Sequence, residues 1–164
     1  MNDLYFPVLA VGIIMVAVIT LVLGLSSAGF SSRVHSPGTR YWVRGDAGFQ
    51  RWLKLQVGRS IAYGRQLLLV LNDERFELFI PHRTEPVWSI DYKAIVSVST
   101  EAFRSRSVPN TRAVRIAFDG IPSFAVRPEV LWIPSRFSPP TLVDDLAHDL
   151  GERARRAEAA IAPE

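Results

Sequence analysis

The run Leu4–Leu25 constrains this chain more than any other feature, because it carries no charged side chain. At 1.5 Å per residue it would form about 33 Å of helix, enough to cross a hydrocarbon core of about 30 Å. Pro7 falls in the first turn, where a missing N–H costs little, and Gly12 and Gly24 are tolerated in membrane helices. We therefore expect residues 1–28 to form a transmembrane anchor.

A cleaved secretory signal is the competing interpretation of the same run. Ser26–Ala28 resembles a small-residue cleavage site. However, the segment before the run has Asp3 and no Lys or Arg, and the run is longer than the core of about 7–15 residues found in signal peptides. These two observations favour a retained single-pass anchor.

The charges that flank the run predict its orientation. Asp3 is the only charged side chain before the run, whereas Lys and Arg dominate after it. The excess of cations predicts that the N-terminus lies outside and the C-terminal domain in the cytoplasm, at the plasma (inner) membrane. The same cations could also contact anionic lipid. They are Arg33, Arg40, Arg44, Arg51, Lys54, Arg59 and Arg65, against the single acid Asp46.

The rest of the chain is long enough for one domain. Residues 29–48 resemble a basic juxtamembrane linker, and residues 49–162 form the expected domain. Aromatic and basic side chains alternate over Tyr41–Lys54, which suits either core packing or a lipid headgroup region. This stretch is either a short amphipathic helix or a first strand, and the alternation over Leu53–Val57 favours a strand.

Apolar runs separated by turn residues predict an antiparallel sheet. Gln66–Leu71 and Phe76–Ile80 flank the turn Asn72–Arg75 and read as a hairpin, and Asp119-Gly120 is a second hairpin signal. Arg104–Thr111 reads as a polar loop. Further strands are expected at Val87–Ile90, Ile95–Thr100, Arg112–Phe118, Ser123–Val126 and Leu131–Ile133.

The C-terminal segment has the spacing of an amphipathic helix. Leu142, Leu146 and Leu150 recur every four residues, and Thr141 can act as an N-cap after two prolines. We expect a helix over 141–161 that packs on the sheet. The predicted fold class is therefore α+β: a single N-terminal transmembrane helix, then an antiparallel β-barrel or sandwich capped by a C-terminal α-helix.

The order of these elements resembles the bacterial pleckstrin-homology-like (PH-like) domains, which are themselves similar to GRAM domains. The matching residues are Leu67–Arg75, Phe76–Ile80, Ser89–Val98 and the closing helix 141–161. The resemblance implies a barrel closed by that helix, in proteins that are often paired with transmembrane helices. It implies no catalysis, but a scaffold that binds a lipid headgroup, a peptide or another protein.

No catalytic or metal-binding pattern occurs in the sequence. His35, His82 and His148 are isolated, the chain has no cysteine, and no phosphate loop or nucleophile elbow is present. We expect His148 on the exposed face of the last helix. The sequence therefore predicts no enzyme, no cofactor and no metal, and it carries no stacking motif for nucleic acid.

The predicted function is that of a membrane-anchored PH-like adaptor or accessory subunit that binds a membrane protein at the cytoplasmic face. The alternative is recognition of anionic lipid headgroups, since loop arginines can bind phosphate. A solvated loop is the simpler explanation of the same arginines. The candidate contact residues are Arg40, Tyr41, Trp42, Arg44, Arg51, Lys54, Arg104, Arg106 and Arg112.

Overall fold

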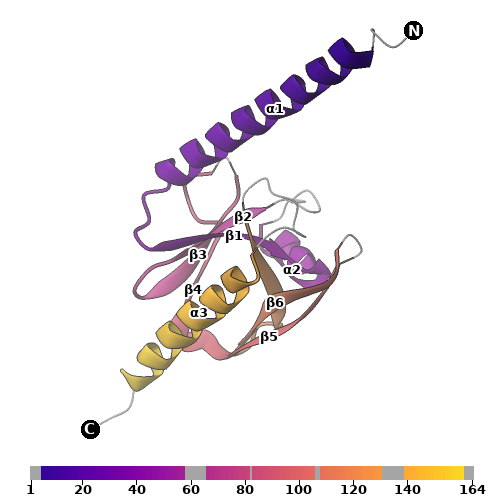
Figure 1. The fold of residues 1–164 in the computed structure, drawn as a ribbon. Helices are drawn as coiled ribbons and strands as arrows, with labels where there is room; N and C mark the ends of the chain where they lie inside the picture. The colour runs from indigo at the N-terminus through magenta and orange to yellow at the C-terminus, as the bar shows by residue number, and fades with distance from the viewer. Residues whose placement is uncertain (1–4, 58–65, 82, 106–107, 131–138, 161–164) are drawn as a thin grey trace.

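The protein is described from a computed structural model, which defines residues 5–57, 66–81, 83–105, 108–130 and 139–160. A long N-terminal helix precedes a β-rich domain, which ends in a second long helix (Figure 1). The elements are α1 (Tyr5–Arg33), β1 (Thr39–Gly45), α2 (Ala47–Val57), β2 (Leu67–Leu71), β3 (Arg75–Phe79), β4 (Trp88–Asp91), η1 (Tyr92–Ala94), β5 (Ile95–Ser105), β6 (Val108–Phe118), β7 (Phe124–Glu129) and α3 (Thr141–Ala159).

The seven strands form one curled antiparallel sheet. Their order is β4-β3-β2-β1-β7-β6-β5, so the first strand lies in the middle and the sheet curls into a half-barrel (Figure 1). Helix α3 packs against β5, β6, β7 and η1. The predicted α+β arrangement, with a C-terminal helix on an antiparallel sheet, is confirmed.

The hairpin of β2 and β3 shows why the sequence folds this way. Leu71 pairs with Phe76, and the Asn72 side chain accepts hydrogen bonds from the backbone N–H groups of Glu74 and Arg75. All five residues of β2 are buried, because both faces of this strand are covered. Leu67, Leu69 and Leu71 face the main core. On the other face, Leu68 and Val70 contact the C-terminal end of α1, at Phe30 and Val34, which we call the foot of α1.

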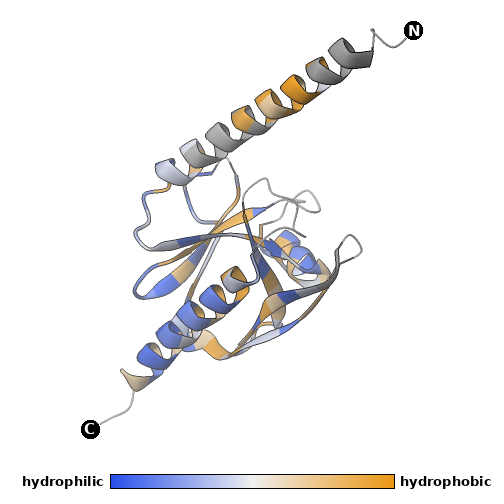
Figure 2. Ribbon diagram, in the orientation of Figure 1, coloured by the Kyte–Doolittle hydropathy of each residue, from blue (hydrophilic) through white to orange (hydrophobic). Residues whose placement is uncertain are grey.

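The main core lies between the sheet, α2 and α3. Aromatic rings fill its centre: Trp52 lies 4.5 Å from Trp88, and Phe49 lies 4.7 Å from Phe124, between ring centroids. Helix α3 contributes its predicted apolar stripe, while its outer side is hydrophilic (Figure 2). The buried residues of this stripe are Val143, Leu146 and Leu150.

The prediction of a transmembrane anchor over residues 1–28 is wrong. Among the side chains that the structure describes, no helical stretch is both long and apolar enough to cross a membrane. The apolar side chains described in α1 extend from Val11 to Leu21.

Several local predictions also need correction. Residues 47–57 form a helix rather than a strand, because Phe49 and Leu53 lie one turn apart and face the core. The predicted polar loop at 104–111 is largely strand, since β5 and β6 extend to Ser105 and from Val108. Thr141 lies inside α3 and makes no capping bond; the N-cap position is Pro140.

The remaining predictions concern the linker, one more strand and the histidines. β1 lies within the segment 29–48 that was predicted as a linker. The strand expected at Leu131–Ile133 falls in residues that the structure does not describe, and so does His82. His148 is exposed on α3, as predicted, and His35 is also exposed.

Candidate functional site

Most of the candidate contact residues have structural partners. Arg40 on β1 donates to the backbone carbonyl oxygens of Ser31, Val34 and Ser36, at 2.5, 2.9 and 3.2 Å. Ser31 belongs to the last turn of α1, whose carbonyl groups have no partner within the helix. Arg40 is therefore the C-terminal cap of α1, and its charge complements the helix dipole there.

Trp42 follows Arg40 by two residues on β1, so both lie on the face of the sheet that contacts α1, which we call its outer face. Trp42 packs against α1 there. Its ring centroid is 6.1 Å from that of Phe30. Phe30 and Val34 are buried in a second apolar cluster with Leu68, Val70 and Phe79. Trp42 thus packs the foot of α1 against the sheet. This packing accounts for an aromatic side chain next to arginines, so no bound ligand is needed to explain it.

Arg44 takes part in a buried polar cluster between β1 and β7. Its Nε donates to Glu129 Oε2 at 3.2 Å, and Gln66 donates to the same oxygen at 3.0 Å. The Glu129 side chain is fully buried, so the loss of Arg44 would remove one of the groups that compensate a buried charge. Burial lowers the pKa of the neighbouring Arg127.

Tyr41 on β1 and Arg112 on β6 each link α3 to the sheet. The Tyr41 hydroxyl donates to Asp149 Oδ2 at 2.8 Å. Arg112 makes a bidentate pair with Asp144, at 2.7 and 3.1 Å, but both side chains are about half exposed. Exposed ion pairs contribute little to the free energy of unfolding. Arg112 therefore helps to orient α3 on the sheet but adds little stability.

The partly buried Tyr41 and the buried Tyr92 predict alkaline sensitivity. Burial raises the pKa of Tyr41 and of Tyr92 well above the usual value near 10, and for Tyr41 the hydrogen bond to Asp149 adds to the effect. Above about pH 10 the unfolded chain loses these protons while the folded protein keeps them. Ionisation of the tyrosines should therefore leave the free energy of unfolding independent of pH near neutrality and make it fall above about pH 10.

Tyr41→Phe tests this pH dependence. The variant should lose about 1 kcal/mol at neutral pH with the hydrogen bond, and its stability should fall less steeply above about pH 10. Denaturant unfolding measured over about pH 8–11 gives both quantities. An unchanged slope in the variant would contradict the assignment to Tyr41.

Two of the nine candidates, Arg51 and Lys54, lie exposed on the outer side of α2. Leu55, beside them, is 81% exposed. Arg51 Nε donates to the carbonyl oxygen of Ala47 at 3.3 Å, and no ion pair of either cation appears among the described residues. The side chains of Arg104 and Arg106 lie outside what the structure describes.

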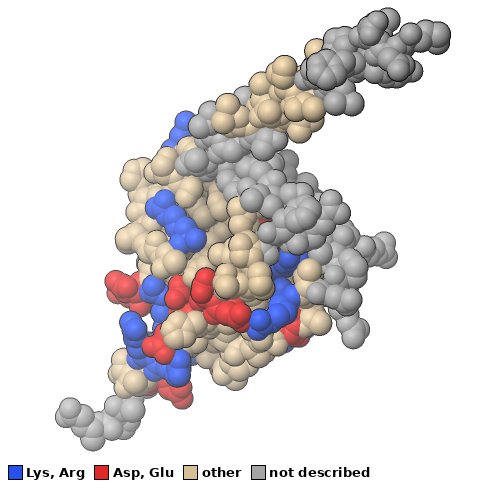
Figure 3. All heavy atoms as spheres, in the orientation of Figure 1, with Lys and Arg blue, Asp and Glu red and all other residues tan. Residues whose placement is uncertain are grey.

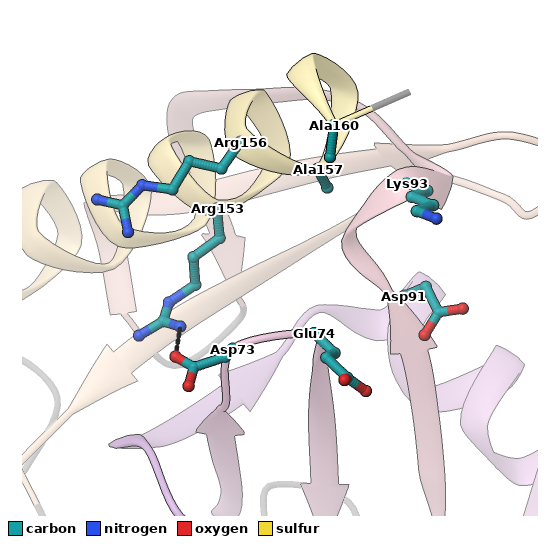
Figure 4. Close-up of a pocket in the computed structure, with 8 residues that line it drawn as sticks. All are labelled: Asp73, Glu74, Asp91, Lys93, Arg153, Arg156, Ala157 and Ala160. Carbon is teal, nitrogen blue, oxygen red and sulfur yellow. Dashed lines mark ion pairs between the residues drawn. The ribbon is translucent and has the colours of Figure 1, made fainter. Parts of the chain in front are cut away.

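The charged hollow beside the end of α3 was not predicted from the sequence. It has a volume of about 550 Å³ and lies between the β2–β3 turn, η1 and the last turns of α3 (Figure 4). Arg153 crosses one wall, forming an ion pair with Asp73 at 3.6 Å and donating to the carbonyl oxygen of Asn72. The lining of the hollow has as many carboxylates as cations, and both kinds of side chain are also mixed over this end of the domain (Figure 3). The hollow therefore shows no preference for ligands of either charge. Its lining residues are Asp73, Glu74, Asp91, Lys93, Arg153, Arg156, Ala157 and Ala160.

The most unusual surface of the protein is α1 itself. Its described side chains in the middle of the helix are apolar: Figure 2 colours this part as hydrophobic, and Figure 3 shows no charged residue among its described atoms. They are 50–65% exposed. Ile13, Ile14 and Met15 follow one another at about 100° around the axis, so the exposed surface is not confined to one face. The residues are Val11, Ile13, Ile14, Met15, Val16, Val18, Ile19 and Leu21.

Comparisons with known proteins assign no family. No family model matches the chain, and no curated protein matches it. The predicted membership of the PH-like family is therefore wrong, because it depended on a pattern of strands and turns that many antiparallel sheets share. Within the described residues, no group of three or more His, Cys, Asp or Glu side chains is placed to hold a metal ion.

Proposed function

We propose that this chain is a non-enzymatic accessory subunit that binds the apolar helices of a partner protein through α1. The observation that supports the proposal is the exposed apolar surface of α1 between Val11 and Leu21. Exposed apolar patches of this kind mark interaction sites, since a monomer rarely leaves them in contact with water.

The distribution of the exposed residues indicates what kind of partner fits. A helix that is apolar on every side is normally surrounded by other apolar groups. A single partner helix covers only one side, so we expect several helices around α1. The predicted cytoplasmic location, and the prediction that the partner is a membrane protein, stay predictions from the sequence.

The energetics favour the same partner. The eight exposed side chains are already about half covered by their own helix, so burying the remainder gains on the order of 10 kcal/mol in total. Association costs about 4–15 kcal/mol in lost freedom. A partner that covered most of the circumference would gain about twice as much as one that covered a single side, so a partner that surrounds α1 is favoured.

Affinity purification of the full chain in mild detergent, followed by mass spectrometry, tests the proposal. We expect one helical protein in a stoichiometric amount. The double variant Ile13→Gln/Ile14→Gln should lose it, and the control Leu55→Gln, which changes an exposed leucine on α2, should retain it. Recovery of lipid without protein, or equal recovery with both variants, would contradict the proposal.

A second candidate function is contact with anionic lipid headgroups through α2. Arg51 and Lys54 lie on the exposed side of this helix, next to the exposed Leu55, an arrangement that suits a charged surface with an apolar interior. Each cation near such a surface contributes about 1 kcal/mol at moderate salt. Two cations give only weak binding, which is why this function ranks second.

Vesicle sedimentation tests this second candidate. Arg51→Glu/Lys54→Glu should reduce binding to phosphatidylserine vesicles about tenfold or more at low salt, and the difference should shrink as salt rises. Arg155→Glu, on the exposed side of α3, is the control. Equal binding by the two variants would exclude α2 as the contact.

A further inference from the structure

We propose that α1 and the sheet form one rigid unit and that Arg40 is the positioning residue that sets the direction of α1. This inference goes beyond the proposed function: a partner that surrounds α1 would meet the β-rich domain in one fixed orientation. Three independent features of the joint between α1 and β1 support it.

The first feature is the set of hydrogen bonds made by Arg40. One guanidinium nitrogen donates to Ser31 O inside α1, and the other donates to Val34 O and Ser36 O in the connection that follows. Arg40 itself lies on β1, where it pairs with Val70 of β2. A single planar group therefore links the end of the helix, the connection and the centre of the sheet.

The second feature is apolar packing on the outer face of the sheet. Val34, directly after α1, is 1% exposed, and Phe30, in the last turn, is 9% exposed. Both lie in one cluster with Leu68 and Phe79, on which Trp42 also packs. Rotation of α1 about its foot would separate these side chains and expose them to water.

The third feature is a connection that has little room to move. Gly38 precedes β1 with a φ of 134°, a conformation that side chains other than glycine rarely adopt. A Cβ at this position would lie 2.1 Å from the carbonyl oxygen of Leu71, so the backbone of the connection lies directly against the end of β2. A connection held at both ends restricts the helix that it joins.

Distance measurements between two spin labels test the proposal on the full chain alone, in detergent micelles. The chain has no cysteine, so Ile14→Cys on α1 and Ser99→Cys on β5 would be the only labelled positions, and both side chains are exposed. We expect one narrow distance distribution. Arg40→Ala should lose the narrow peak, and Arg40→Lys, which keeps the charge but not the planar fork, should lose it in part.

Arg75→Ala is the matched control, because Arg75 is an exposed arginine of the same sheet, 3.6 Å from Glu77. It should leave the distribution narrow. A broad distribution in the unsubstituted chain would overturn the rigid unit, and a narrow one in Arg40→Ala would overturn the role of Arg40. Tryptophan fluorescence of each variant identifies one that has unfolded, in which case Arg40→Lys decides. The measurement needs no partner, so its result is independent of whether α1 binds one.

Discussion

Leu146→Ala is expected to lower the free energy of unfolding by about 2–5 kcal/mol, one of the two largest effects that the structure predicts. Leu146 is completely buried on α3 and lies in the main core, together with Leu150 and the inner side chains of the sheet. Truncation removes apolar contacts from both α3 and the half-barrel, and the curled sheet cannot close over the cavity. Denaturant unfolding followed by tryptophan fluorescence measures the loss.

His148→Ala is the control for this substitution, because His148 lies on the exposed side of the same helix, two residues away. Its stability should change by less than about 0.5 kcal/mol. Equal losses in the two variants would show that α3 does not present the predicted stripe to the core.

Gly38→Ala is expected to destabilise the protein by about 2 kcal/mol or more, while Gly151→Ala stabilises it by about 0.5–1 kcal/mol. Gly38 has a positive φ, and a Cβ there would meet the Leu71 carbonyl group. Gly151 lies within α3 with open space around its Cα, so an added methyl group favours the helix without a clash.

The same unfolding measurement decides the sign of each effect. Since the chemical change is identical at the two positions, only the local backbone and its neighbours differ. A neutral Gly38→Ala would show that the connection between α1 and β1 relaxes freely, and it would weaken the argument for a rigid joint.

The parts of the fold that were predicted correctly depend on local patterns. The β2–β3 hairpin follows from two apolar runs around Asn72–Arg75, and α3 follows from leucines spaced four apart. Helix α2 was one of two alternatives for its stretch, and the strand was favoured because Leu53, Leu55 and Val57 also fit the alternation of a strand. Only tertiary packing separates the two patterns, since Leu53 is buried against the core and Leu55 is exposed.

The roles of the basic side chains could not be predicted, because their partners are distant in the sequence. Arg44 pairs with Glu129 and Arg112 with Asp144, and Arg40 donates to a helix end that the sequence placed in a linker. The number of arginines near aromatic residues could not show that several of these arginines contact distant parts of the same chain. The exposed cations of α2 could have been found from a helical spacing of Arg51, Lys54 and Leu55.

The surface of α1 and its foot together determine how a partner would meet this protein. In the proposed complex, the apolar side chains from Val11 to Leu21 would provide the binding surface, and Arg40 with Phe30 and Trp42 would hold that surface at a set angle to the sheet. An accessory subunit built in this way would place its β-rich domain at a defined position on the partner.

Photo-crosslinking in intact cells tests the central claim most directly. A photoreactive residue placed in turn at Ile13, Ile14 and Met15 samples three directions around α1, and one at Leu55 samples α2 as the control. We predict that the three α1 positions crosslink to the same helical protein and that Leu55 does not. Crosslinks from α1 to no protein, or from only one of its three positions, would contradict a partner that surrounds the helix.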